Sequence, residues 1–186
     1  MRRRSLPALL LGAALAARAK AQPTPATPEI TGEQAQRDLR ILKRAFTDLH
    51  PGLYRFATPA EIDAEFAAAD AAVKGGTTRA AMLLTVSRLA AAVQCGHTWA
   101  NPANQGEAVR ALFARDDKLP VALRWIEGRA LVTGSADAAV KPGSELLAID
   151  GRPVTEIRDA LLPLLRADGR HEGAVAKRLS QLDSGA

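Results

Sequence analysis

The sequence predicts an α+β protein in which helices come first and short strands follow. Between residues 31 and 93, apolar side chains recur at intervals of three and four residues, the spacing of one helical face. After residue 118, apolar and polar side chains alternate over short runs separated by glycine-containing turns. These patterns predict a three-helix cap domain over residues 31–117, followed by a small module of a β-hairpin and a helix over residues 118–168.

Residues 1–21 have the three parts of a secretory signal peptide. Residues 2–4 are arginines, residues 6–17 form the apolar run, and Ala19-Lys20-Ala21 supplies the small residues that a signal peptidase recognises. We therefore expect export to the periplasm or the exterior, with cleavage after Ala21. The arginines at the start leave both the general secretory route and the twin-arginine route open.

Residues 22–30 contain three prolines and predict an extended linker between the signal peptide and the first helix.

The excess positive charge of the chain lies in the signal segment. The chain has 25 Lys and Arg against 20 Asp and Glu, a formal net charge of +5, and residues 1–21 hold five of the basic residues and no acidic one. The remainder is balanced, so we expect no nucleic-acid partner. Outside the N-terminus no run reaches about 18 apolar residues, so no membrane span is expected after signal cleavage.

Three threonines mark the starts of the predicted helices. Each side chain can accept a hydrogen bond from a backbone N–H of the first turn, and a Gln or Glu three residues after the first two completes a capping box. The starts are Thr31, Thr58 (followed by Pro59) and Thr78, and the ends are His50-Pro51-Gly52, Gly75-Gly76 and about Val93. The predicted inward-facing stripes are Leu39, Leu42, Phe46 and Leu49; Ile62, Phe66, Ala69 and Val73; and Leu83, Val86, Leu89, Ala90 and Val93.

The second half contains two turns, Glu127-Gly128 and Asp150-Gly151, that favour hairpins. Aspartate and glycine both tolerate a positive φ, which makes Asp-Gly a strong signal for a two-residue hairpin turn. The predicted elements are strands over residues 121–125, 129–133 and 145–149 and a helix over residues 154–165.

Three segments together resemble a known family. The run VKPGSELLAIDGRPV, residues 140–154, resembles the part of PDZ-like domains where a Pro-Gly turn leads into a strand that ends in an Asp-Gly or Asn-Gly hairpin. Upstream lie CGHT, residues 95–98, directly after a helix, and LHPGLYRF, residues 49–56. This order resembles the N-terminal half of the S41 serine peptidases, the tail-specific and tricorn-like proteases, over about residues 35–182.

The resemblance implies a serine-bearing catalytic core after a PDZ-like module at residues 118–168, and residues 169–186 would be only its beginning. The chain has no Gly-x-Ser-x-Gly motif, and none of its later serines has a Lys or His at the spacing of an activated pair. We therefore expect a truncated serine-type peptidase that lacks its nucleophile domain and is inactive as an isolated chain. The serines considered, expected to be caps, turns and solvated hydroxyls, are Ser87, Ser135, Ser144, Ser180 and Ser184.

His97 is the candidate catalytic residue. The resemblance implies that it is the general base that accepts the proton of a serine supplied by the later core. A neutral imidazole suits this role because histidine changes its charge near neutral pH. Cys95-Gly96 precedes it where several relatives have an acid or a serine. The alternative is a histidine that hydrogen-bonds the backbone at the end of the third helix, and Thr98 is expected to fix the turn.

Cys95 and His97 also raise two other chemistries. They could share a metal, but zinc takes three or four protein ligands and the sequence offers no further His/Cys cluster, so neither a metal nor another cofactor is expected. A Cys95 thiolate paired with His97 could be a nucleophile. The alternative is a buried free cysteine at a helix end.

The remaining histidines and the tryptophans are expected to have structural roles. We expect His50 to interact with the C-terminal carbonyls of the first helix, with a substrate contact as the alternative, and His171 to lie at a solvated helix start. Trp99 and Trp125 are expected to be packing anchors, with a peptide groove as the alternative.

Two function classes follow. The first is the front half of an exported serine peptidase that acts on peptides or unfolded proteins. The second is a non-catalytic periplasmic module that binds peptides or serves as a scaffold. PDZ-like domains bind an extended peptide as an added strand beside a sheet edge, although no clear Gly-rich carboxylate loop is present here.

Overall fold

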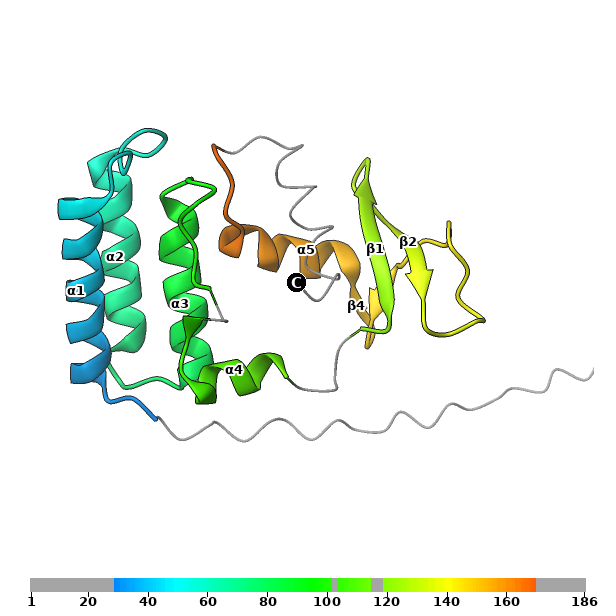
Figure 1. Ribbon diagram of the computed structural model, residues 1–186, viewed down its shortest axis with the longest axis horizontal. Coiled ribbons are helices and arrows are strands. Elements are labelled where there is room, and N and C mark those ends of the chain that lie inside the picture. The colour runs from blue at the N-terminus through cyan, green and yellow to red at the C-terminus, as the bar shows by residue number, and fades with distance from the viewer. Residues whose placement is uncertain (1–28, 102–103, 115–118, 170–186) are drawn as a thin grey trace, which may run out of the picture.

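The structure, a computed structural model, describes residues 29–101, 104–114 and 119–169 (Figure 1). The described part is a mixed α+β structure with five α-helices and two small antiparallel sheets. None of its helices is long and apolar enough to cross a membrane. The expected signal peptide, nearly all of the linker, and His171, Ser180 and Ser184 lie outside the described residues.

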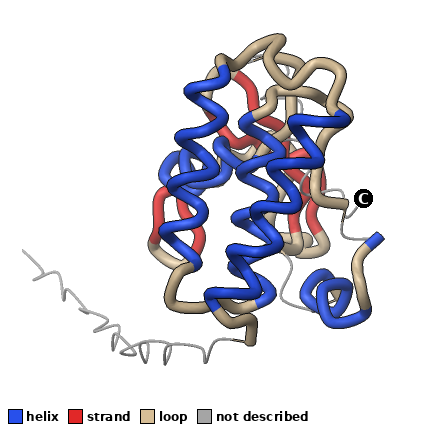
Figure 2. Tube along the Cα trace, turned by 90° about the vertical axis from the view of Figure 1, so that its left-hand side faces the viewer, coloured by secondary structure: helices blue, strands red, loops and turns tan. Residues whose placement is uncertain are grey.

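Three helices form the first layer of the molecule: α1 (Gly32–Leu49), α2 (Pro59–Val73) and α3 (Arg79–Ala92). They stand side by side, with the strands behind them in the view of Figure 2. We call these three helices and the loops between them the helical bundle. Its core contains the whole predicted stripe of α2 together with Leu39 of α1 and Leu89 of α3. Burial of these faces, rather than helix propensity alone, stabilises the bundle.

The predicted threonine caps are confirmed. Thr31 and Thr58 each form a complete capping box, with Gln34 and Glu61 at the third helical position, and Thr78 accepts a hydrogen bond from the Ala81 N–H at 3.1 Å. These contacts satisfy N–H groups that have no partner within the helix.

The predicted burial of Leu49 is wrong, because its side chain is 78% exposed. It lies in the last turn of α1, where Leu53 of the following loop joins the bundle core. A residue of the next turn thus contributes the inward contact at this end of the bundle.

We call the described residues 119–169 the C-terminal module. Strands β1 (Val121–Ile126) and β2 (Arg129–Ser135) form the predicted hairpin, and its turn has positive φ at Glu127 and Gly128, at 50° and 77°. The helix α4 (Glu107–Phe113) precedes this module and was not predicted from the sequence. With seven residues it is too short to give a clear periodic signal.

The predicted strand over residues 145–149 is divided between two partners. Residues 144–146 lie along the edge of β2 that faces away from β1. There the Val132 N–H donates to the Ser144 carbonyl and the Leu146 N–H donates to the Ala130 carbonyl, both at 2.8 Å. Only β3 (Ala148–Ile149) is a strand, and it pairs with β4 (Arg152–Pro153) across the Asp150-Gly151 turn. The chain leaves β2 to form this second hairpin, so one continuous strand does not form.

The last predicted helix is also shorter than expected. The helix α5 (Val154–Leu161) passes into the 3₁₀ helix η2 (Leu162–Leu164), which contains Pro163. Proline has no N–H to donate and its ring hinders a preceding α-helical turn, which explains the early end.

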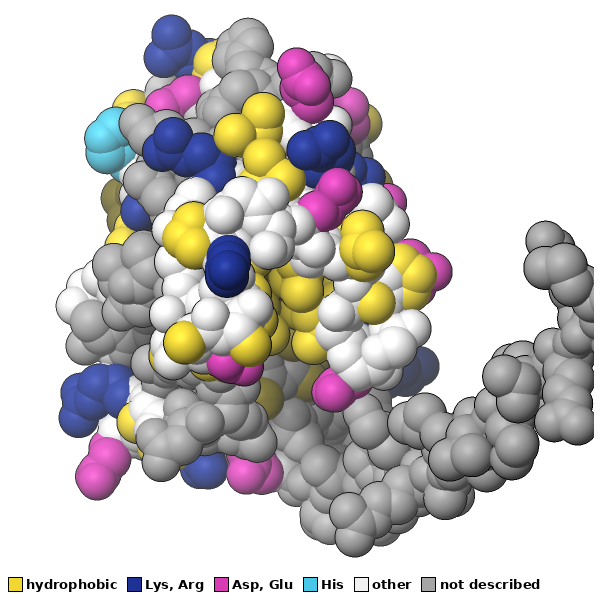
Figure 3. Space-filling view, turned by 90° about the vertical axis from the view of Figure 1, so that its right-hand side faces the viewer, with side chains coloured by type: hydrophobic (Ala, Val, Ile, Leu, Met, Phe, Trp, Pro, Cys, Tyr) yellow, Lys and Arg dark blue, Asp and Glu magenta, His cyan; other side chains and the backbone are white. Residues whose placement is uncertain are grey.

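The module buries few side chains of its own. Ile126 is 46% exposed and Leu147 is 70% exposed, and Figure 3 shows hydrophobic side chains at the surface on this side of the molecule. Its final segment returns to the bundle, where η2 packs against α3. The Gly169 N–H donates to the Gln94 carbonyl at 3.1 Å, which fixes the end of the described chain beside the end of α3.

Candidate functional site

The candidate site begins with the turn that follows α3. Val93 is the C-cap of the helix, and Gln94 then adopts a φ of 54°, in the left-handed region that commonly ends helices. The Gln94 side-chain amide donates to the Phe56 carbonyl at 3.1 Å. The Thr98 N–H donates to the Cys95 carbonyl at 3.0 Å, which closes the turn as expected. Cys95 and His97 are therefore held in one short, hydrogen-bonded segment.

A second segment, residues 166–169, lies directly on this turn. The Gly96 N–H donates to Asp168 Oδ1 at 2.8 Å, 72 residues along the chain. The Arg166 guanidinium lies 3.9 Å from the centroid of the Trp99 ring, a distance at which a cation is attracted by the face of the aromatic ring. Together with the Gly169 contact, these interactions place the Asp168 carboxylate beside the turn.

The absence of a side chain at Gly96 leaves room for this close approach. A Cβ atom at position 96 would lie 2.8 Å from Asp168 Oδ2 and 3.2 Å from its Cγ. Any larger residue would force the carboxylate away from the turn.

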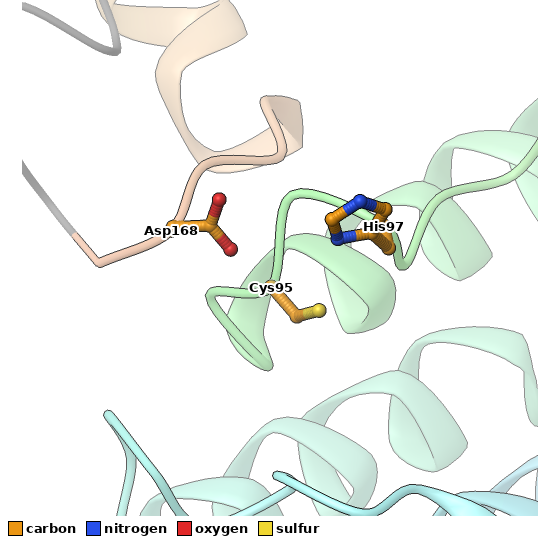
Figure 4. A group of neighbouring side chains, drawn as sticks. All are labelled: Cys95, His97 and Asp168. Atoms are coloured by element: carbon orange, nitrogen blue, oxygen red, sulfur yellow. The ribbon is translucent and has the colours of Figure 1, made fainter.

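The result is a cluster of three side chains, Cys95, His97 and Asp168 (Figure 4). Each contributes one sulfur, nitrogen or oxygen atom, and these three atoms all lie within 4.8 Å of one another. Cys95 is half-buried against the bundle core, whereas His97 and Asp168 are exposed. The cluster therefore has a buried side formed by the bundle and an open side that a ligand or another protein surface can reach.

The hydrogen bond with the backbone that the structural alternative expects of the His97 side chain is not formed in the described part of the chain. The side chain is exposed, and it forms no other hydrogen bond there. The turn is stabilised instead by backbone contacts and by Thr98. The role of His97 as a general base stays a prediction.

The expected contact of His50 with the carbonyls at the end of the first helix is made by its backbone, whose N–H donates to the Phe46 carbonyl at 3.1 Å, whereas its side chain has other partners. Its Nδ1 atom accepts a hydrogen bond from the Gly52 N–H at 3.2 Å, and its Nε2 atom lies 2.8 Å from Thr98 Oγ1. Because Nδ1 accepts, a neutral His50 ring carries its hydrogen on Nε2 and donates to Thr98. Pro51 and Gly52 turn the chain at the end of α1, which aims the ring at Thr98 and joins the LHPGLYRF and CGHT segments in space.

Asp168 is the member of the cluster that sequence reasoning missed. The search for a third metal ligand considered only histidine and cysteine, and no spacing pattern links a residue to a partner 72 positions away. The sequence argument that no further His/Cys cluster accompanies Cys95 and His97 did not consider a carboxylate as the third ligand.

Two of the serines have the structural roles expected of them. Ser87 Oγ donates to the Leu83 carbonyl within α3 at 2.7 Å. Ser135 Oγ accepts from the Asp137 N–H at 3.0 Å in the turn after β2. Both hydroxyls are engaged in local backbone contacts.

Trp99 does not have the buried packing role that was expected, because it is 44% exposed. Its contact with Arg166 gives it a different structural role, which is to hold the Asp168 segment on the turn. Trp125 in β1 is half-buried, and Arg158 lies 5.7 Å from its ring centroid.

A cleft of about 430 Å³ lies next to the cluster, between α3 and the segment from η2 to Gly169. Its apolar lining includes Leu162 and Ala167. At one side, Arg88 Nε donates to Glu65 Oε2 at 3.0 Å, and this hydrogen bond with the Glu65 carboxylate raises the pKa of Arg88 above its ordinary value.

A match with a known family or protein would assign the chain directly. No protein-family model matches it, and no curated protein matches it significantly. The geometry of the cluster and the sequence resemblance therefore provide the basis for a functional proposal.

Proposed function

We propose that this chain is the front part of an exported S41-type serine peptidase, in which His97 is the general base for a serine on a core domain. The observation that carries this proposal is the state of His97. It is an exposed imidazole without a hydrogen bond in the described chain, on a turn whose neighbouring residues Gln94 and Thr98 are hydrogen-bonded. A base that must receive a proton from a partner domain requires such an open and fixed position.

In the proposed reaction, a ring nitrogen of His97 accepts the proton of the serine hydroxyl while the serine oxygen bonds to the substrate carbonyl carbon. The peptide C–N bond then breaks, and the imidazolium of His97 donates its proton to the leaving nitrogen. Water repeats the sequence to release the acyl group. The serine and the groups that stabilise the oxyanion would come from the core domain.

Asp168 orients the His97 ring in this proposal. Its carboxylate oxygen lies within 4.8 Å of a His97 ring nitrogen, and a carboxylate oxygen can accept a hydrogen bond from an imidazole N–H and so orient the ring. Catalytic hydrogen bonds are often long before substrate binds, so a small movement of two exposed side chains can shorten this distance. The Gly96 N–H keeps the carboxylate close to the ring.

The substrate class proposed is an extended peptide or unfolded protein. The C-terminal module would correspond to the PDZ-like module of the family, and its hairpins and α5 support that assignment. The proposed site of action is the periplasm or the exterior, on the basis of residues 1–21.

The proposal can be tested by fusing the chain to the serine-bearing core of a tail-specific or tricorn-like peptidase. Cleavage of an unstructured protein and labelling of the core serine by a fluorophosphonate are measured in the presence of EDTA. We expect the chain alone to be inert and the fusion to be active. His97→Ala should lower kcat about 100- to 10,000-fold, the usual contribution of a general base.

The control variant is Arg44→Ala, because Arg44 is exposed on α1 and forms an ion pair with Asp48 one turn along the same helix. It should retain the activity of the fusion. Full activity of the His97→Ala fusion would contradict the proposal. Cleavage by the isolated chain that is lost in Cys95→Ser would support a thiol nucleophile instead. Peptide binding without cleavage in any fusion would favour the non-catalytic module.

A further inference from the structure

We infer that Cys95, His97 and Asp168 form a binding site for a zinc-like divalent cation, and that the cation controls the proposed general base. The first support is the set of donors. A thiolate, an imidazole and a carboxylate are all zinc ligands, and the thiolate selects against magnesium and calcium, which prefer oxygen. The three donor atoms already lie within 4.8 Å of one another.

The distances suit a tetrahedral ion after a small movement. With zinc–ligand bonds of about 2.0 to 2.3 Å, neighbouring ligand atoms in a tetrahedron are separated by about 3.5 Å. The donor atoms need to approach by at most about 1.3 Å, given the 4.8 Å limit on their present separation. His97 and Asp168 are exposed, so rotations of their side chains can supply this movement without disturbing the bundle core.

The second support is the way in which Asp168 is held. Its Oδ1 atom accepts a hydrogen bond from the Gly96 N–H, a contact of the kind that orients carboxylate ligands in metal sites, and within the described residues Oδ2 accepts no hydrogen bond. Gly96 lies between the two other ligands in the chain, and a Cβ atom at this position would require the carboxylate to shift from its present place. The turn is thus shaped to receive Asp168 from the distant segment.

Metal binding would have a direct consequence for His97, and this step rests on the proposed function. On binding, the Cys95 thiol releases its proton to water and the thiolate and an imidazole nitrogen each donate an electron pair to the ion. That nitrogen can then no longer accept a proton from a serine. Zinc should therefore inhibit the proposed peptidase, and a chelator should restore its activity.

The site can be tested on the full chain without any core domain. The reduced, metal-free chain is titrated with Co²⁺ alone, and the thiolate-to-cobalt absorption in the near ultraviolet is recorded. Zn²⁺ is then added as a competitor. We expect one Co²⁺ per chain, a thiolate band that Zn²⁺ removes, and protection of Cys95 from iodoacetamide by Zn²⁺.

Four variants identify the ligands. Cys95→Ser should remove the thiolate band. His97→Gln and Asp168→Asn should each weaken cobalt binding by at least about tenfold, because even the loss of a residue that only orients a metal ligand lowers the affinity by that factor. Gly96→Ala keeps all three ligands but displaces Asp168, and should weaken binding about tenfold. The matched control is Asp159→Asn, an exposed carboxylate of α5 whose ion pair is with Arg158. Its affinity should be unchanged.

The absence of a thiolate band in the wild-type chain would overturn the inference, as would equal affinity in the wild-type and Asp168→Asn chains. Circular dichroism confirms that each variant is folded. If a variant does not fold, the wild-type chain still tests the inference, because failure of Zn²⁺ to protect Cys95 from iodoacetamide would overturn the metal site. Cobalt binding combined with full activity of the His97→Ala fusion would reject the general base and keep the metal site. The reverse result would reject the metal site alone.

Discussion

The helical bundle and the C-terminal module are stabilised in different ways. Of the fifteen buried apolar residues in the described chain, eleven belong to the bundle, and only four belong to the module: Ala130, Val132, Val154 and Ala167. Each bundle helix also begins with a threonine cap, whereas α5 begins without a side-chain cap. The bundle therefore carries most of the hydrophobic stabilisation, and the module depends more on backbone hydrogen bonds and turns.

This difference explains how the site is built. The well-packed bundle fixes the turn that carries Cys95 and His97, and the module contributes Asp168 through a segment held by three contacts. The cluster thus combines two residues of a turn on the bundle with one residue of a segment that reaches the bundle through these contacts.

The largest expected effect is the loss of a bundle core side chain. Phe66 is 5% exposed and packs edge-on against Phe46, with ring centroids 6.1 Å apart. Phe66→Ala should lower the free energy of unfolding by about 3 to 5 kcal/mol, because it removes apolar burial and leaves a cavity. Urea denaturation followed by circular dichroism measures this change.

The comparison variant is Leu147→Ala in the module, where the side chain is 70% exposed. It should change the free energy of unfolding by less than about 0.5 kcal/mol. Equal losses in the two variants would show that the bundle does not dominate the stability of the chain.

The same contrast governs what the sequence predicts. The caps of the bundle depend on residues three positions apart, and the stripe Ile62, Phe66, Ala69 and Val73 depends on the helical period alone, so both are confirmed. The two-residue turns of the module are confirmed for the same local reason, because Asp150-Gly151 and Glu127-Gly128 have the positive φ values that the turn requires.

Features that depend on distant partners were not predictable. The burial of Leu49 was wrong because a residue beyond the helix enters the core at its end, and the strand over residues 145–149 was wrong because two partners divide it. Asp168 joins the site through contacts with residues more than 60 positions earlier. No local pattern encodes such a contact, so the third member of the site required the structure.

A smaller effect is expected from a change at the junction of the two regions. In Gly96→Ala the new Cβ would displace the Asp168 carboxylate, which ends the hydrogen bond from the Gly96 N–H. The loss in free energy of unfolding should be about 1 kcal/mol, typical of one hydrogen bond. Hydrogen exchange at the Gly169 amide should accelerate more than exchange within α2.

Gly75→Ala provides the matched control, because a Cβ atom at that position meets no atom within 4 Å. It should leave exchange at Gly169 unchanged. Unaltered exchange at Gly169 in the Gly96→Ala chain would mean that the Asp168 contact does not hold the end of the module.

The smallest change in the free energy of unfolding is expected for His97→Ala, which we compare with a variant of His50, a histidine at the same end of the bundle. His50 is half-buried and contacts both the Gly52 N–H and Thr98 Oγ1, whereas His97 is exposed and forms no hydrogen bond in the described chain. His97→Ala should therefore change the free energy of unfolding by less than about 0.5 kcal/mol. His50→Ala leaves polar groups of two loops unpaired and should cost about 1 to 3 kcal/mol. Urea denaturation of both variants in EDTA measures these two changes in the free energy of unfolding. A loss above about 2 kcal/mol for His97→Ala lies in the range for an unsatisfied buried partner. Such a loss would assign His97 to the structure of the turn and contradict its proposed chemistry. A change close to zero in the free energy of unfolding would show that the His97 side chain does not stabilise the fold, as expected for a general base or a metal ligand.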